Sequence, residues 1–319
     1  RGLSAADAPA ARPDAIGAAD KRYSLCPMSM PMIYGLRDHE RYVYHYTRAS
    51  VAREFILKDR TLRFSSFSRT NDPKESKDWE FNLATYQGRD LGGYSFKQTS
   101  EWLSAALKSK AKLACFSLDR PPLTGDHTRD ILGRGLAKPR MWAQYSENHS
   151  GVCLVFDKAI LLEAVMAKFE PMPCLSGPVT YQNHYFVRSL DPHEFMINVD
   201  LLESLGPKDY VIAHLKQHYK ALFFEKLLDW RDESEWRIVI LADTDDDLYL
   251  PIQDALVGVI HGASTERTAS DSLFELTESL RVEHMGLTWK NSSPWYDIGS
   301  FRWSASDRAL QAKLARNGA

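Results

Sequence analysis

The sequence lacks several features that would place a protein in a class at once. Its 319 residues include 4 cysteines, which form neither a Cys-x-x-Cys pair nor a Cys/His group with the spacing of a zinc site. No apolar run is long enough to cross a bilayer, and no signal-peptide pattern occurs. These absences predict a cytoplasmic protein with reduced thiols, no bound metal and no membrane partner.

An excess of charge of one sign is missing as well. The 40 Lys and Arg residues nearly balance the 42 Asp and Glu residues, so the net charge of -2 does not by itself indicate a nucleic-acid partner. A glycine-rich phosphate loop and an internal repeat are also absent from the sequence. Hydrophobic residues make up 44% of the chain, which is enough to build a large core. The function of this globular chain therefore has to be sought in local motifs.

The residue pattern divides the chain into three parts. Residues 1–33 have no usable period and begin with an Ala- and Pro-rich stretch, so we expect a disordered leader or linker. Residues 34–281 mix strand and helix patterns and predict a single α+β catalytic domain. We expect a mixed or split antiparallel sheet with flanking helices in this domain. Residues 282–319 mix aromatic and polar side chains and are predicted to form a C-terminal extension.

The run 42–47 has a period of two and predicts a strand with two chemically different faces. One face is aromatic, and the other carries His45 and Thr47. If the aromatic face packs on a core, the imidazole points to whatever lies across the sheet. A hydrogen-bonded structural histidine is the alternative interpretation of His45.

The residues after this strand predict a compact strand, helix, strand unit. An amphipathic pattern over 50–58 indicates a short helix with Val51, Phe55 and Ile56 on its inner side, and 62–66 indicates a second strand. Asn71 then opens a turn with Asp72 and Pro73. Polar side chains therefore follow both predicted strands.

A charged cluster precedes the hydrophobic run 236–240. Glu233 and Glu235 stand at the start of a predicted strand, so both carboxylates should fall on one of its faces, with Arg237 next along. Adjacent charges are costly inside a core, so this face either opens to solvent or lines a cleft that binds a charged ligand. An ion pair between Glu235 and Arg237 is a purely structural alternative.

Trp142 and Tyr145 form an aromatic pair three residues apart, as on one face of a helical turn. A role in ligand binding predicts that at least one of the two rings has an edge open to a cleft. A role in the core predicts that both rings are enclosed.

Taken together, these motifs resemble the ordered motifs of a large bacterial family of domains of unknown function, over roughly residues 41–262. The motifs that carry the resemblance are His45-Tyr46-Thr47, Asn71-Asp72-Pro73, Met141-Trp142-x-x-Tyr145 and Glu233-Ser234-Glu235-Trp236-Arg237. The family name itself implies no activity.

A more distant resemblance is to ADP-ribosyltransferase-like proteins, which include DNA-modifying toxins and RNA 2′-phosphotransferases. In these proteins a His and a hydroxyl residue end the first strand, a short helix and a strand follow, and a Glu lies on a late strand. His45 and Thr47 match the first element, and Glu235 or Glu233 matches the last. The central Ser-Thr-Ser motif of that class is missing, and Ser65 with Ser66 is only a loose substitute.

The second resemblance implies NAD as substrate and a macromolecular acceptor, either nucleic acid or protein, in a toxin or phage-defence effector. Cleavage of the nicotinamide bond builds positive charge on the ribose, which a catalytic Glu235 would stabilise, with Glu233 as the alternative. His45 would hydrogen-bond the adenosine ribose. The residues that the resemblance assigns to NAD binding are Tyr46, Thr47, Arg63, Ser65, Asn71, Trp142, Tyr145 and Arg237.

This interpretation has two consequences that can be checked. His45, Arg63, Tyr145 and Glu235 should line one cleft, and finding His45 and Glu235 on opposite sides of the sheet would remove the transferase hypothesis. A Glu235 that serves catalysis alone should be replaceable by Gln without a change in thermal stability, whereas an ion pair with Arg237 predicts a loss.

Other classes of protein compete with the transferase hypothesis. A metal-dependent nuclease needs clustered carboxylates, and the stretch 72–80 offers some in an unremarkable spacing. A Cys/His hydrolase would use Cys115 or Cys153, but both lie in apolar strands that favour inert core thiols. A binding module without catalysis would use the aromatic motifs as a recognition groove for nucleic acid or protein.

Overall fold

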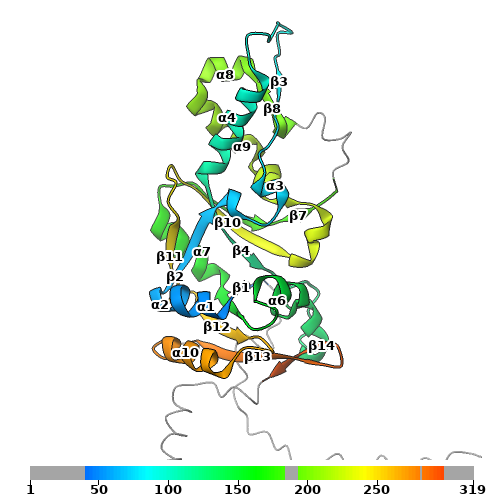
Figure 1. The fold of residues 1–319 in the computed structure, drawn as a ribbon, viewed down its shortest axis with the longest axis vertical. Helices are drawn as coiled ribbons and strands as arrows, with labels where there is room; N and C mark the ends of the chain where they lie inside the picture. The colour runs from blue at the N-terminus through cyan, green and yellow to red at the C-terminus, as the bar shows by residue number, and fades with distance from the viewer. Residues whose placement is uncertain (1–39, 184–192, 281, 298–319) are drawn as a thin grey trace, which may run out of the picture.

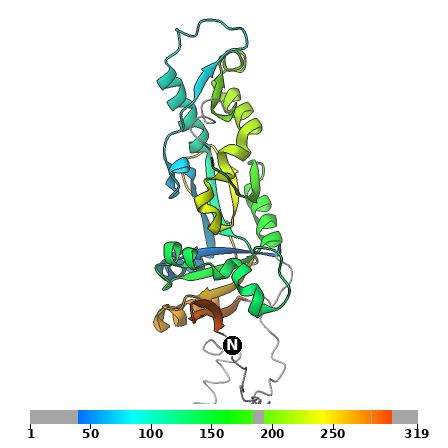
Figure 2. The ribbon, with the colours of Figure 1, turned by 90° about the vertical axis from the view of Figure 1, so that its right-hand side faces the viewer.

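The computed structural model describes residues 40–183, 193–280 and 282–297. Over these residues the chain is a mixed α and β structure, built on a ten-stranded sheet with helices on its faces. The molecule is elongated, as two perpendicular views show (Figures 1 and 2). The predicted leader, 1–33, and residues 298–319 of the predicted extension lie outside the described residues.

The strands are β1 (Tyr42–Thr47), β2 (Thr61–Ser66), β3 (Asn82–Ala84), β4 (Ala111–Ser117), β5 (Val152–Asp157), β6 (Cys174–Pro178), β7 (Thr180–Tyr181), β8 (Met196–Asn198), β9 (Glu225–Lys226), β10 (Glu235–Leu241), β11 (Leu248–Pro251), β12 (Leu256–His261), β13 (Glu283–Lys290) and β14 (Ser293–Asp297). The helices are α1 (Ala49–Val51), α2 (Leu57–Asp59), α3 (Pro73–Ser76), α4 (Phe96–Lys110), α5 (His127–Asp130), α6 (Pro139–Tyr145), α7 (Lys158–Phe169), α8 (Val199–Leu205), α9 (Pro207–Phe223) and α10 (Arg267–Thr277). Shorter turns are η1 (Ala52–Ile56), which is π-helical, and the 3₁₀ turns η2 (Phe67–Arg69), η3 (Ile131–Gly133), η4 (Gly135–Ala137), η6 (His193–Phe195) and η7 (Leu228–Glu233).

The main sheet branches at β4. Its strands follow the order β11-β2-β4-β1-β5-β12-β13-β14, while β10 pairs with the other edge of β4 and then with β6. The strands β1 and β2 share one edge of β4. On this edge β2 pairs near the start of β4, at Leu113 and Lys112, whereas β1 pairs only at the end of β4, at Ser117. The strands β1 and β2 therefore diverge from β4. Because β12 and β13 are parallel among antiparallel neighbours, the predicted mixed sheet with flanking helices is confirmed.

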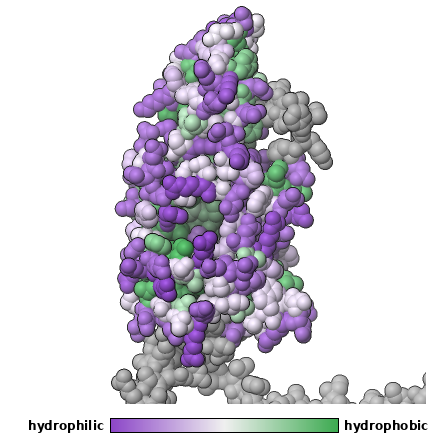
Figure 3. Space-filling view, in the orientation of Figure 1, coloured by the Kyte–Doolittle hydropathy of each residue, from purple (hydrophilic) through white to green (hydrophobic). Residues whose placement is uncertain are grey.

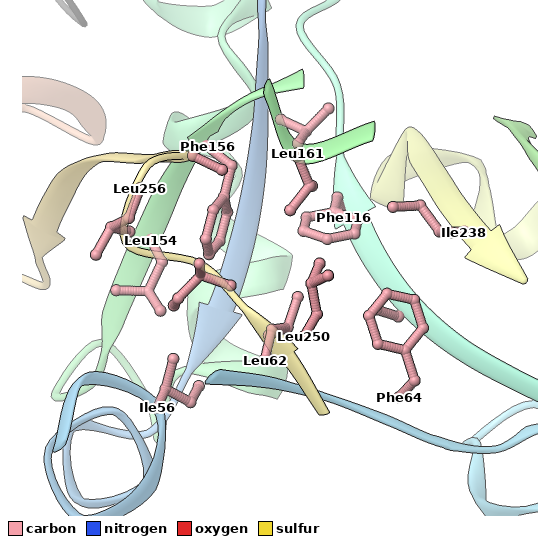
Figure 4. Packing of buried hydrophobic residues seen from close by; sticks show 14 of the residues in the cluster. Ile56, Leu62, Phe64, Phe116, Leu154, Phe156, Leu161, Ile238, Leu250 and Leu256 are labelled. Carbon is pink, nitrogen blue, oxygen red and sulfur yellow. The ribbon is translucent and has the colours of Figure 1, made fainter. Parts of the chain in front are cut away.

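Three hydrophobic clusters hold the helices against the sheet. One face is covered by η1, α7 and α10, where Phe116, Leu154 and Leu250 point toward one another (Figure 4). Behind β4 and β10, a second cluster packs α4 and α9, which lie with β3 and β8 at one end of the molecule (Figure 1). The third cluster joins the Tyr42, Tyr44 and Tyr46 side of β1 to the segment of η3, η4 and α6. Each fully buried large side chain contributes about 2 kcal/mol by the area it removes from water.

The strand, helix, strand unit at the start of the domain forms as predicted, but its helix is irregular. It begins at Ala49 rather than after Ser50, and a π turn occupies its middle. Phe55, predicted to face the core, is 59% exposed. The π turn widens the helix and shifts the register of the following side chains, so that Ile56 is buried as predicted and Leu57 is buried in place of Phe55.

The sheet continues past the domain boundary predicted at residue 281. The strand β13 pairs in parallel with β12, and β14 pairs with β13 in antiparallel register. Met285 and Leu287 of β13 are buried in the third cluster. Residues 283–297 are thus part of the sheet, and they stabilise the side that carries β5 and β12.

Candidate active site

A cavity of about 250 Å³ lies where β1 separates from β4. Its walls come from β1, β4, the segment after β2, α6 and the corner between η7 and β10. His45, Asn71, Tyr145, Glu233 and Glu235, which are distant in sequence, all line it. Most of the predicted site is therefore brought together by the fold. The face seen in Figure 3 is mainly hydrophilic, with a recess that has an apolar floor near its middle.

His45 and Glu235 reach this cavity from opposite faces of the sheet. The register places Tyr44, Ser117 and Glu235 in one row across β1, β4 and β10, so these three share a face. His45 follows Tyr44 and points to the other face. Placement on opposite faces is the arrangement that was expected to count against a transferase. Both residues nevertheless line the cavity, because β1 and β4 pair only at Tyr44 and Ser117 and separate beyond this point.

The His45 imidazole bridges the gap between the two strands. Its Nδ1 lies 2.9 Å from the carbonyl oxygen of Cys115 on β4. A carbonyl only accepts hydrogen bonds, so Nδ1 carries the proton and, in the neutral ring, Nε2 is an acceptor. Burial lowers the pKa of His45 below its ordinary value of 6.5, although the bond to Cys115 opposes this. At neutral pH the ring is therefore uncharged.

Glu233 and Glu235 converge for a different reason from the one predicted. They are not alternate residues of one strand, because η7 ends at Glu233 and β10 begins at Glu235. Between them Ser234 adopts a left-handed conformation with φ 44° and ψ 52°. Its hydroxyl accepts hydrogen bonds from Arg120 and Lys138, which hold this corner in place.

The converging carboxylates belong to a buried ion network. Lys226 Nζ lies 2.8 Å from an oxygen of Glu233 and 2.8 Å from an oxygen of Glu235. Arg237 Nε donates to Glu235 Oε1 at 2.7 Å, and Arg237 Nη1 lies 2.7 Å from Glu75 Oε1. All five side chains are nearly inaccessible to solvent. The structural alternative predicted for Glu235 and Arg237 is therefore present within a larger network.

The pKa values of Glu235 and Glu233 are shifted in opposite directions in this network. For Glu235 burial opposes ionisation, but Arg237 and Lys226 outweigh it and lower the pKa to about 2. Burial instead raises the pKa of Glu233, with Lys226 opposing and Glu235 reinforcing this rise. Glu235 is thus ionised at neutral pH, and Glu233 is the carboxylate that accepts a proton more readily.

The predicted aromatic pair is divided between cavity and core. Tyr145 lines the cavity and donates a hydrogen bond from its hydroxyl to Glu233 Oε1 at 2.7 Å. Trp142 is 0% exposed, and its Nε1 donates to the carbonyl oxygen of Leu136. Its ring meets Tyr46 edge to face. The assignment of Trp142 to ligand stacking is therefore corrected, because its ring is enclosed by the third hydrophobic cluster.

Two further predicted ligand-binding residues serve the framework in this structure. Tyr46 borders the cavity, but its ring lies in the third hydrophobic cluster and its hydroxyl donates to the carbonyl oxygen of Gly135. Arg237 is 0% exposed and positions Glu235. Lys226 and Glu75 were not among the predicted site residues, since only the fold shows that both reach this cavity.

A second cavity of about 590 Å³ adjoins the first, and His45, Thr70 and Cys115 line both. The predicted residues Thr47, Arg63 and Ser65 line this second cavity rather than the first. Arg63 is therefore separated from Glu235, and the expected single cleft consists of two adjoining cavities. The exposed rings of Phe55 and Tyr249 also line the second cavity, and neither was predicted to do so.

Two kinds of feature are absent from residues 40–183, 193–280 and 282–297. Within these ranges no group of three or more His, Cys, Asp or Glu side chains is placed to hold a metal ion. None of the helices in the same ranges is both long and apolar enough to cross a membrane.

The fold and cavity define a mixed α and β protein with a polar site at the branch of its sheet. Residues 141–238 match the model of a family described as "Protein of unknown function (DUF2971)". This range includes Tyr145, Lys226, Glu233 and Glu235, whereas His45 lies outside it. Neither a curated protein nor a solved structure matches the chain.

Proposed function

We propose that this protein cleaves the glycosidic bond of NAD and transfers ADP-ribose to a macromolecule. The observation that carries the proposal is that His45, Tyr145 and Glu235 line one cavity although the chain separates them widely. A second cavity with Arg63 on its wall continues from the first and provides room for the rest of a dinucleotide.

The charge of Glu235 suits the bond that breaks. When the bond between ribose C1′ and the nicotinamide nitrogen breaks, its electron pair neutralises the pyridinium ring, and positive charge builds on the ribose. A buried carboxylate that stays ionised stabilises this charge more strongly than one in water. An acceptor hydroxyl or amine then bonds to C1′ and loses a proton. Glu233, whose pKa is raised by burial, takes that proton.

The remaining residues fit the other parts of the dinucleotide. The Nε2 atom of neutral His45 accepts a hydrogen bond from a ribose hydroxyl at the junction of the two cavities. Arg63 offers a guanidinium for the pyrophosphate. The rings of Phe55 and Tyr249 offer flat surfaces on which the adenine base stacks.

The proposal is tested by measuring NAD consumption and ADP-ribose transfer, with protein and nucleic acid offered separately as acceptors. The wild-type protein should release nicotinamide, and Glu235→Gln should reduce turnover per folded molecule by at least about a hundredfold. Glu163→Gln is a matched control, because Glu163 is exposed on α7 away from the cavity. Binding of NAD without turnover would favour a binding module, and metal-dependent cleavage of nucleic acid would favour a nuclease.

A further inference from the structure

The first cavity contains buried oxygen atoms that have no hydrogen-bond partner among the described residues. Glu75 is 1% exposed, and its Oε2 atom lacks a partner there. The hydroxyl oxygen of Thr70 is also buried and lacks a partner in the same ranges. Both residues line the cavity. A buried polar atom without a partner costs about 1–3 kcal/mol, so the two atoms point to a ligand that donates a hydrogen bond to Glu75 and exchanges one with the Thr70 hydroxyl.

The local fold fixes both side chains. They lie in the segment that follows β2, where Asp72 accepts a hydrogen bond from the backbone of Lys74 and caps α3. The backbone N–H of Glu75 donates to the Asp72 carbonyl oxygen in the first turn of this helix. The Oε1 atom of Glu75 lies 2.7 Å from Nη1 of Arg237, so Oε2 is the oxygen that remains available to a ligand in the cavity.

The charges of the ion network do not balance. The carboxylates of Glu75, Glu233 and Glu235 face the cations Lys226 and Arg237, which leaves one negative charge in excess. Arg69 also lines the cavity, but its guanidinium is bound by both carboxylate oxygens of Asp247. A ligand group that carries positive charge and N–H donors would complement this environment.

We propose that Glu75 and Thr70 bind the nicotinamide end of the dinucleotide and select it against the nicotinic acid form. This inference rests on the proposed function, because NAD is the substrate it assigns. The pyridinium ring supplies the positive charge, and the carboxamide N–H₂ donates to Glu75 Oε2. The Thr70 hydroxyl donates to the carboxamide oxygen. Nicotinic acid adenine dinucleotide carries a carboxylate at that position, which offers no donor and is repelled by Glu75.

The test compares NAD with nicotinic acid adenine dinucleotide as ligands of the full-length chain. Calorimetric titration gives the two dissociation constants, and nicotinamide or nicotinic acid release gives kcat and KM. The wild-type protein should prefer NAD by at least about a hundredfold, because the acid form leaves buried polar groups unpaired. Glu75→Gln removes the excess charge and adds an N–H donor, so the preference should fall at least tenfold, mainly through binding.

A second variant keeps the test independent of folding. Glu75 also neutralises Arg237, so Glu75→Gln is compared at equal folded fraction, measured by circular dichroism. Thr70→Val removes a hydroxyl that has no partner in the described residues, so we expect folding to be unchanged and NAD affinity to fall about fivefold to tenfold. Thr70→Ser should restore most of the affinity.

The outcomes separate this inference from the proposed function. Equal affinity of the wild-type protein for both dinucleotides, or an unchanged preference in both Glu75→Gln and Thr70→Val, would overturn the assignment of Glu75 and Thr70 even if NAD is cleaved. A strong preference that both variants reduce, in a protein that never cleaves NAD, would support the binding site and refute the transferase. Absence of binding to either dinucleotide would overturn both.

Discussion

Replacing Glu235 by Gln removes one charge from the ion network and nearly keeps the shape of the side chain. Glu235 is 4% exposed, and its carboxylate contacts Arg237 at 2.7 Å and Lys226 at 2.8 Å. Without this carboxylate Lys226 keeps only Glu233 and Arg237 keeps only Glu75, so each buried cation loses one of its two carboxylate partners. The structure therefore predicts that Glu235→Gln destabilises the fold, in contrast to the expectation for a carboxylate that serves catalysis alone.

The size of the effect follows from the pKa of Glu235. A fall from 4.5 to about 2 means that the folded protein favours the ionised side chain by about 3 kcal/mol. Gln resembles the protonated form, so Glu235→Gln should lower the free energy of unfolding by about this amount at pH 7. Breaking other buried ion pairs costs about 3–5 kcal/mol, which is the same order.

The pH dependence gives an independent check. The unfolded chain binds a proton at Glu235 near pH 4.5, whereas the folded protein does so only near pH 2. Stability from this group is therefore complete above pH 4.5 and is lost as the pH falls from there toward 2. The wild-type protein should lose about 3 kcal/mol more over this window than the Glu235→Gln variant.

Urea unfolding measures both effects, with Glu163→Gln as the exposed control. In a double-mutant cycle, Glu235→Gln and Arg237→Gln should each destabilise, and the double variant should lose less than the sum. An unfolding midpoint of Glu235→Gln equal to that of Glu163→Gln, or additive losses in the cycle, would refute the network argument. NAD turnover is then compared per folded molecule, so that a catalytic role of Glu235 is not mistaken for a loss of folded protein.

Three further predictions test other parts of the site. Trp142→Phe should lower the free energy of unfolding by about 2 kcal/mol, because it leaves a gap and removes the hydrogen bond to the Leu136 carbonyl oxygen. The KM for NAD should stay unchanged. A large rise in KM without a loss of stability would instead indicate that Trp142 contacts the ligand. Ser234→Gly and Ser234→Ala both remove the hydroxyl, but only Gly relieves the left-handed backbone, so urea unfolding should find Gly more stable by about 1 kcal/mol. The affinity for NAD should be constant above pH 6.5 and weaken at lower pH. The lowered pKa keeps His45 neutral at neutral pH, and protonation at lower pH turns its acceptor Nε2 into a donor. Titration calorimetry should show that the affinity of the His45→Gln variant no longer depends on pH in this way.

The parts of the fold that the sequence predicted are those governed by local periodicity. The strand β1 was predicted at its observed bounds, because its aromatic and polar residues alternate over its whole length. The hydrophobic run 236–240 lies within β10, where its residues are buried. In each case the residues within a single element carry the signal.

The errors come from features that depend on contacts across the chain or on a single backbone angle. The π turn that exposes Phe55 and the left-handed Ser234 that joins two carboxylates leave no period in the sequence. Glu75 was considered only among the carboxylates of 72–80 that a metal-dependent nuclease could use, since its contact with Arg237 connects residues far apart in sequence. The division of the predicted cleft into two cavities likewise follows from the branch of the sheet at β4.

This branch also explains why stability and the proposed activity are difficult to separate at the site. Where β1 leaves β4, the edge of the sheet loses its regular pairing, and the His45 imidazole spans the gap to Cys115. The same gap admits the cavity, so the residues that close it are also the residues that a ligand would meet. Glu235 likewise serves both the fold and the proposed activity, because the contacts with cations that keep it ionised also hold η7, β9 and β10 together. Thr70 differs from both, since its hydroxyl lines the two cavities without a partner in the described residues. A change at Thr70 is therefore the one expected to alter ligand binding with the least effect on folding.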